Sequence, residues 1–158
     1  MKMSNLELKR ALPSEQETKE FATRLAAIVR LGDVIALEGE IGAGKTVFAR
    51  AFVEALGGGE EVPSPTFTLV QTYNGSVGPI HHFDLYRLDT PEEALELGME
   101  ELLPEGISLI EWPDRLGPYM PCDHLTIRIL ENRGMGRILE VVGVGEWRQR
   151  MSILKKRF

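Results

Sequence analysis

The chain has 158 residues, of which 43% are hydrophobic and 27% charged, as expected for one globular domain with a core of its own. Its formal net charge of −6 argues against a general nucleic-acid binder, and no apolar run reaches the roughly 20 residues that a membrane-spanning helix needs. The single cysteine, Cys122, excludes an intrachain disulfide, and the N-terminus lacks the apolar block of a secretory signal, so we expect a cytoplasmic protein.

The first predicted elements are a helix, a strand and a second helix. A helix is expected after Ser14, which has capping-box spacing to Glu17, and Gly32 is its expected stop. The apolar run VIALEG, residues 34–39, predicts a buried strand. Apolar residues at helical spacing over residues 47–56 predict the second helix, so a glycine-rich segment lies between a strand and a helix.

The middle of the chain predicts a hairpin, a helix and a strand. TFTLVQTY (66–73) and PIHHFDLYRL (79–88) are rich in β-branched and aromatic residues and flank turn residues, which favours a β-hairpin. TPEEALELGMEELL (90–103) predicts one helix with Thr90 as its cap. ISLIEW (107–112) predicts another buried strand.

The last third of the chain predicts a second hairpin and a terminal helix. HLTIRIL (124–130) and RILEVVGV (137–144) are typical of strands, and the turn residues ENRGMG separate them. A final helix is expected to begin near Glu146 or Trp147. Helices interleaved with strands predict one α/β domain over residues 1–158.

The glycine-rich segment GEIGAGKT fits the P-loop pattern G-x-x-x-x-G-K-[ST], and it has the required strand before it and helix after it. Its glycines let backbone N–H groups turn inward on an anion, and the helix adds its positive N-terminal end. Lys45 would reach the β- and γ-phosphates, and Thr46 would give its hydroxyl to Mg²⁺. The residues expected to contact the nucleotide here are Gly39, Glu40, Ile41, Gly42, Ala43, Gly44, Lys45, Thr46 and Val47.

The motif completes the fold prediction. We expect an α/β fold of the P-loop NTPase type, with three layers (α/β/α) around a mixed, mainly parallel central sheet and two hairpins. The chain lacks the N-K-x-D and T-K-x-D motifs that read guanine, which favours ATP over GTP as the nucleotide.

A nucleoside triphosphate bound with Mg²⁺ also needs carboxylates, and two acids end predicted strands. Asp84 ends IHHFD and Glu111 ends ISLIE, so one can hold metal-bound water while the other orients the attacking water. Which acid has which role stays open. His81, His82 and His124 have no metal-like arrangement with cysteines, and we interpret them as structural.

The segment VPSPTFT, residues 62–68, has two interpretations. Its Thr66 could sense the γ-phosphate in a segment that changes order on hydrolysis. Alternatively, the segment is a proline-rich entry to a strand. Both interpretations stay open.

Taken in order, GEIGAGKT, SPTFTLVQTY, HFDLYRLDTPEE, ELG and LIEWPDR resemble the TsaE family, also called YjeE, of bacterial P-loop ATPases. The resemblance covers about Leu12 to Val144. It implies an accessory ATPase required for N6-threonylcarbamoyladenosine (t6A) at adenosine 37 of tRNA. Such a protein hydrolyses ATP with Mg²⁺ when docked on the TsaD–TsaB pair, is weak alone, and meets tRNA only through that complex.

The resemblance also implies roles for single residues. Lys45 matches the phosphate-binding lysine and Thr46 the Mg²⁺ ligand, while Asp84 and Glu111 match acids near the metal. Trp112 matches a tryptophan that the family needs for activity, and Thr66 matches a switch-like threonine. The family uses an N-terminal segment and a late loop around the base, where this chain has Glu15, Thr18, Arg133 and Arg137. The chain departs from the usual loop at Glu40, Ile41 and Val47, where the family often has Asp, Leu and a second Thr.

Two other functions remain compatible with the P-loop. One is a small-molecule kinase, although no long basic insertion provides a lid over the loop. The other is a non-enzymatic binding module, in which ATP only orders VPSPTFT for docking.

Overall fold

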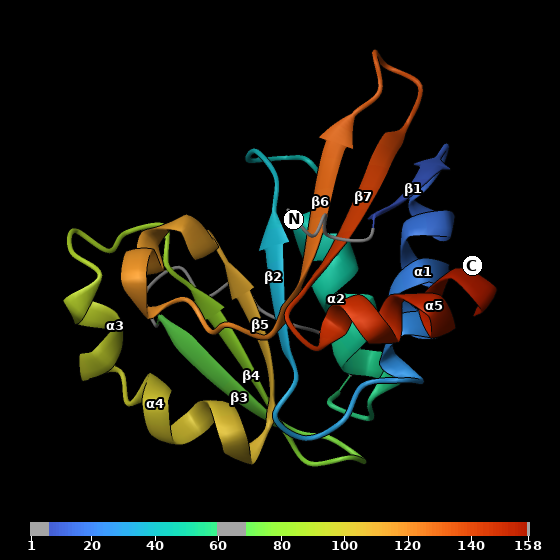
Figure 1. Ribbon diagram of the computed structural model, residues 1–158. Helices are drawn as coiled ribbons and strands as arrows, with labels where there is room; N and C mark the ends of the chain where they lie inside the picture. Colours follow the sequence, from blue (N-terminus) through green and yellow to red (C-terminus); the bar gives the residue numbers. More distant parts are fainter. Residues whose placement is uncertain (1–6, 60–68, 158) are drawn as a thin grey trace, which may run out of the picture.

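The computed structural model describes residues 7–59 and 69–157, and in these ranges one seven-stranded sheet has the order β1-β7-β6-β2-β5-β4-β3 (Figure 1). The strands are β1 (Glu7–Leu12), β2 (Val34–Glu38), β3 (Val70–Asn74), β4 (Pro79–Asp84), β5 (Ile107–Glu111), β6 (His124–Glu131) and β7 (Arg137–Val144). The α-helices are α1 (Glu15–Ala26), α2 (Lys45–Ala55), α3 (Glu92–Glu96), α4 (Met99–Leu102) and α5 (Trp147–Arg157). Two 3₁₀ segments, η1 (Leu103–Glu105) and η2 (Pro113–Tyr119), flank β5.

The sheet is mixed, as predicted, and its parallel part forms the centre. Strands β6, β2, β5 and β4 run parallel to one another. Antiparallel pairs add β7 and β1 at one edge and β3 at the other. Both predicted hairpins, β3–β4 and β6–β7, are confirmed. Because the central strands are parallel, the carboxyl ends of β2, β4 and β5 lie along one edge of the sheet, which is where ligands bind in open α/β folds.

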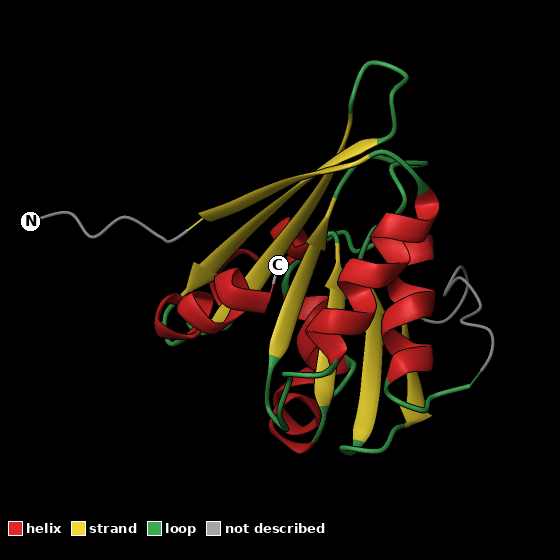
Figure 2. Ribbon diagram, turned by 90° about the vertical axis from the view of Figure 1, so that its right-hand side faces the viewer, coloured by secondary structure: helices red, strands yellow, loops and turns green. Residues whose placement is uncertain are grey.

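Helices cover the two faces of the sheet unequally. On one face α1, α2 and α5 bury the main core, and α1 and α2 lie side by side along the sheet (Figure 2). In this core the ring of Phe48 lies between those of Phe21 and Phe52, at centroid distances of 6.5 and 6.3 Å. The opposite face carries a smaller core, which includes Phe83 and Ile110. That second core takes none of its described buried residues from β1, β6 or β7, so the second helical layer covers only part of the sheet.

Some helix boundaries and caps predicted from the sequence are wrong. The helix expected over residues 90–103 is broken into α3 and α4, because Gly98 between them adopts a left-handed conformation (φ 77°). Ser14 does occupy the N-cap of α1, but no side-chain bond completes a capping box there. Helix α1 ends at Ala26, ahead of the expected stop at Gly32.

Strand β1 was not predicted. It pairs with β7 from Glu7↔Val142 to Leu12↔Arg137 and buries Leu8 and Leu12 in the main core.

Among residues 7–59 and 69–157, the helices are too short or too polar to span a membrane.

Candidate nucleotide-binding site

The P-loop joins β2 to α2 in a conformation that needs glycine. Gly39 has φ 152°, and a Cβ there would lie 2.8 Å from the carbonyl oxygen of Ile129. Gly44 forms the N-cap of α2 with φ 111°, which is also unfavourable for a residue with a side chain. The N–H groups of the first turn of α2 are thereby left to face an anion, as in phosphate-binding helices.

Lys45, the first residue of α2, is only 6% exposed. Its Nζ lies 4.0 Å from Oε1 of Glu111 and 4.1 Å from the ring centroid of Trp112. Burial lowers the pKa of Lys45, and the nearby charges of Glu111 and Asp84 offset part of that effect. A buried ammonium that lies 4.0 Å from its carboxylate partner is suited to an added anion.

The two strand-end acids meet as predicted. Asp84 and Glu111 are register partners on the parallel strands β4 and β5, and both line a cavity of about 290 Å³ together with Lys45 and Thr46. Burial raises the pKa of Asp84, while a hydrogen bond from the N–H of Tyr86 to Oδ1 (3.1 Å) acts in the opposite direction. Desolvated carboxylates beside a lysine and a hydroxyl are typical of a site that gains a cation.

The residues fit a magnesium–nucleotide complex better than a metal ion alone. In residues 7–59 and 69–157, no three His, Cys, Asp or Glu side chains come close enough together to hold a metal. The available hard ligands are the hydroxyl of Thr46 and the carboxylates of Asp84 and Glu111. Mg²⁺ usually takes one or two carboxylates and completes its shell with water and substrate phosphates, which matches this set.

Trp112 and Tyr86 form an aromatic wall of the cavity. Their rings lie 5.0 Å apart at 53°, and the Trp112 ring also contacts the Lys45 ammonium. Trp112 has φ 58°, a left-handed conformation that is costly for a bulky side chain. Such strain is concentrated at functional positions, so it supports the expected role of this tryptophan.

His82, which we interpreted as structural, has its Nε2 at 2.7 Å from Oε2 of Glu111. Its position two residues before Asp84 on a strand was a usable signal, because side chains at i and i+2 share one face. The other two histidines make contacts of the expected structural kind. His81 is bonded to Thr72, and His124 is bonded to the carbonyl oxygen of Pro121.

The start of β7 contacts the P-loop, and the β6–β7 turn contacts the β1–α1 junction. Arg137 donates to the carbonyl oxygens of Ala43 (2.8 Å) and Gly42 (3.1 Å), so it holds the loop from the side of β7. A Cβ on Gly136 would lie 2.6 Å from Cα of Pro13, which places the β6–β7 turn against the β1–α1 junction.

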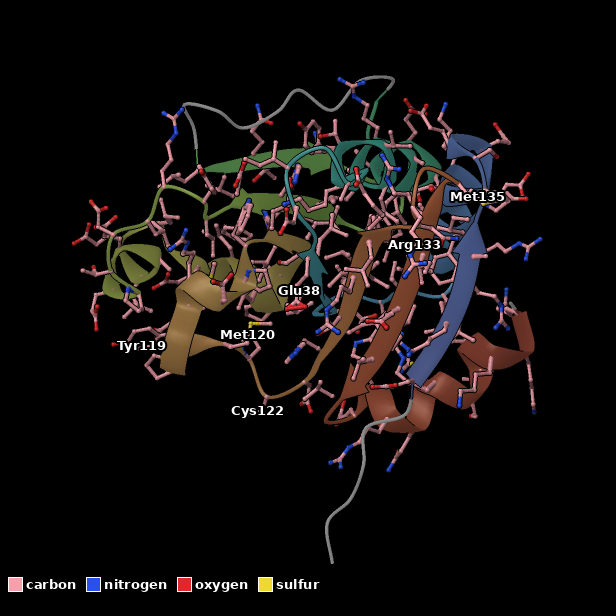
Figure 3. The ribbon with its side chains drawn as sticks, turned by 90° about the horizontal axis from the view of Figure 1, so that it is seen from above. Glu38, Tyr119, Met120, Cys122, Arg133 and Met135 are labelled. Atoms are coloured by element: carbon pink, nitrogen blue, oxygen red, sulfur yellow. The ribbon has the colours of Figure 1, made fainter. Side chains whose placement is uncertain are left out.

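The other residues expected near the base have different environments. Glu15 is exposed at the start of α1, whereas Thr18 is buried. Arg133 is exposed in the β6–β7 turn, on the β1 side of the molecule when it is seen from above, with Glu38 nearer the centre (Figure 3). Thr66 lies outside the described residues.

A second cavity, of about 620 Å³, adjoins the first. The two cavities share Ile41, Lys45, Tyr86 and Trp112 in their walls.

The P-loop residues predicted to contact the nucleotide differ in exposure. Glu40 and Ile41 are exposed at the tip of the loop, Val47 is half-buried and Ala43 is buried. The P-loop therefore presents a charged and an apolar side chain beside the place expected for phosphates.

Comparison with known proteins gives a consistent family match. Residues 12–139 match the family model described as threonylcarbamoyl adenosine biosynthesis protein TsaE. The tRNA threonylcarbamoyladenosine biosynthesis protein TsaE of Bacillus subtilis (strain 168) is 40% identical over 124 residues, which are 78% of this chain and 77% of that protein. The protein of the same name from Rickettsia bellii (strain RML369-C) is 39% identical over 128 residues, 80% of this chain and 89% of its own.

A solved structure agrees with the family match. The crystal structure of YdiB from Bacillus subtilis superposes with a TM-score of 0.82 at 31% sequence identity. The superposition covers 99% of this chain and 98% of that one. The α/β architecture is therefore shared over essentially the whole length of both chains.

Proposed function

Because the chain belongs to the TsaE family, we propose that it is a magnesium-dependent ATPase required for N6-threonylcarbamoyladenosine at adenosine 37 of tRNA. It acts on the TsaD–TsaB pair and meets tRNA through that complex. One observation carries the ATPase part of the proposal. A single cavity is lined by the P-loop residues Lys45 and Thr46 and by two strand-end carboxylates. This is the set of groups that phosphoryl transfer from a nucleotide requires.

The roles follow from the environments of these residues. The loop amides and Lys45 bind the phosphates, and Thr46 and Asp84 would hold the magnesium ion, which supplies positive charge to the phosphate oxygens when bound. Glu111 has one carboxylate oxygen fixed by His82 and the other directed to Lys45, so we assign it to orient the attacking water. Trp112 confines the lysine ammonium by covering it with its ring.

The exposure of one cation at the site supports the proposed dependence on partners. Arg87 lines the cavity and is exposed, so we expect a bound partner to fix the position of this cation. Catalysis of phosphoryl transfer depends on fixed charges around the transferred group. Docking on the TsaD–TsaB pair supplies the missing order, and turnover of the isolated chain is weak.

The test is phosphate release from ATP with and without the TsaD–TsaB pair. We expect slow release alone, a clear increase with the pair, and loss of the increase in Glu111→Gln. Glu131→Gln is the matched control, because Glu131 is an exposed carboxylate at the end of β6. Rapid ATP turnover by the isolated chain that does not change when the TsaD–TsaB pair is added would overturn the proposed partner role. Failure of the chain to bind nucleotide would overturn the proposed ATPase function.

The same material tests the two alternative functions. A phosphorylated product from labelled ATP and a metabolite pool would identify a kinase, whereas free phosphate alone excludes it. A binding module would support tRNA modification in Glu111→Gln without phosphate release. We expect free phosphate from the unmodified chain and loss of modification in the variant.

A further inference from the structure

The buried side chain of His82 contacts Glu111, the acid that we assign to orient the attacking water. His82 on β4 and Glu111 on β5 are joined by a contact of 2.7 Å between Nε2 and Oε2, and their side chains are 2% and 10% exposed. The register of the two parallel strands pairs Asp84 with Glu111 and His82 with Leu109. His82 therefore reaches Glu111 diagonally, from the residue pair that lies deeper in the sheet.

The direction of this hydrogen bond follows from the other ring nitrogen. Nδ1 of His82 is also buried and has no hydrogen-bond partner within the described part of the chain. A hydrogen on Nδ1 would be a buried donor with no acceptor, which is costly. The hydrogen is therefore assigned to Nε2, which donates to Oε2 of Glu111 and leaves only a lone pair on Nδ1.

One donated bond is enough to orient the Glu111 carboxylate. With Oε2 held by His82, Oε1 is the atom 4.0 Å from Nζ of Lys45, on the wall of the cavity. A glutamate has three side-chain torsions, and without this contact its carboxylate could rotate away from the lysine. Groups that orient a catalytic or metal-binding side chain in this way affect activity without touching the substrate.

We propose that His82 is a positioning residue, whose Nε2–H fixes the Glu111 carboxylate in the orientation that phosphoryl transfer needs. This proposal rests on the ATPase function proposed above. It concerns how fast bound ATP is used, because His82 does not line the cavity in which ATP is expected to bind.

Substitution of His82 tests the proposal by steady-state kinetics on the full chain with the TsaD–TsaB pair. His82→Leu keeps an apolar body but removes the donor, and we expect kcat to fall about 10- to 100-fold while KM for ATP changes less than about 3-fold. His82→Gln places an amide donor at about the distance of Nε2, and we expect it to recover a large part of kcat. A simple packing defect would not be repaired by glutamine.

His81 provides the matched control. It is the neighbouring residue, is similarly buried at 3%, and is hydrogen-bonded to Thr72 (3.0 Å) from the opposite face of β4. We expect His81→Leu to lower the melting temperature without changing kcat. Equal losses of kcat in His81→Leu and His82→Leu, or no rescue by His82→Gln, would overturn the proposal.

A second readout does not depend on turnover. In the full chain with ¹⁵N-labelled histidine, imidazole spectra should show hydrogen on Nε2 of His82, and Glu111→Gln should shift that resonance but leave His81 unchanged. Hydrogen on Nδ1, or no response to Glu111→Gln, would overturn the proposal. If the wild type releases no phosphate even with the pair, the proposed function fails, while the spectra still decide whether His82 holds Glu111.

Discussion

Replacing Arg137 by alanine tests how the P-loop keeps its shape. The Arg137 guanidinium donates from Nε to the carbonyl oxygen of Ala43 at 2.8 Å and from Nη2 to that of Gly42 at 3.1 Å. A third bond, from Nη1 to Gly136 (3.1 Å), stays within the β6–β7 turn. Two bonds therefore cross from β7 to the loop, and in Arg137→Ala both carbonyl oxygens lose their charged donor.

The size of the effect follows from the exposure of the two crossing bonds. A hydrogen bond from a charged donor contributes about 1.5–3 kcal/mol when buried. Here the bond to Ala43 is partly buried and the bond to Gly42 is exposed, so solvent screening reduces the sum to roughly 2 kcal/mol. For a domain of this size, that loss lowers the melting temperature by about 4–8 °C. If the whole loss destabilises the loop conformation that binds nucleotide, the affinity for ADP drops by up to about 30-fold.

The assays are thermal unfolding and calorimetry of ADP binding on Arg137→Ala and Arg137→Lys. Lysine keeps the charge but cannot reproduce both bonds, so we expect an intermediate result. Arg148→Ala is the control, because Arg148 donates to a carbonyl oxygen near its own helix start, that of Gly145 at 3.4 Å. An unchanged melting temperature together with unchanged ADP affinity would show that the loop holds itself, and the reasoning would be refuted.

Three further substitutions probe the cost of building the site. Burial raises the pKa of Asp84, so the native stability decreases as the pH rises from the ordinary pKa of 3.8 through the raised pKa. Asp84→Asn should therefore melt at a higher temperature than the wild type at pH 7, and this difference in melting temperature should disappear below about pH 4. Burial lowers the pKa of Lys45, so Lys45→Met should raise the melting temperature while calorimetry detects no ADP uptake. Gly136→Ala should lose roughly 2–4 kcal/mol of unfolding free energy in urea, because φ is 84° and the new Cβ would lie 2.6 Å from Cα of Pro13. Gly134→Ala has a similar φ of 79° but nothing within 4 Å of its new Cβ, so it should lose only the cost of the left-handed backbone, about 1–2 kcal/mol.

The sequence predicts the centre of the site because its information is local. The P-loop pattern lies in one segment, and its glycines have left-handed or otherwise restricted conformations where the pattern requires them. Asp84 and Glu111 each end an apolar strand, and parallel strands bring their carboxyl ends to one edge. Their meeting therefore follows from sheet topology, without knowledge of any single contact.

What the sequence did not predict depends on distant pairing. Strand β1 has the sequence ELKRAL, which shows no clear alternation, and it is a strand because β7 provides its hydrogen bonds. His82 acquires its role from Glu111, which is 29 residues away on another strand and becomes its neighbour only through the register of β4 and β5. The break at Gly98 was missed because a glycine inside a helical pattern is compatible with either a continuous or a divided helix.

The electrostatics of the site link the stability of the chain to nucleotide and cation binding. Burial shifts the pKa of Lys45 downward and that of Asp84 upward, so in both cases desolvation destabilises the charged form that binds a nucleotide or a cation. Phosphate oxygens beside the lysine and a divalent ion beside the carboxylate would each stabilise the charged form. Binding energy from the nucleotide and the ion therefore offsets the desolvation that the folded chain carries at this edge. A ligand that binds only the folded form also stabilises it, so the same residues that lower the stability of the chain alone are expected to make its stability depend on nucleotide.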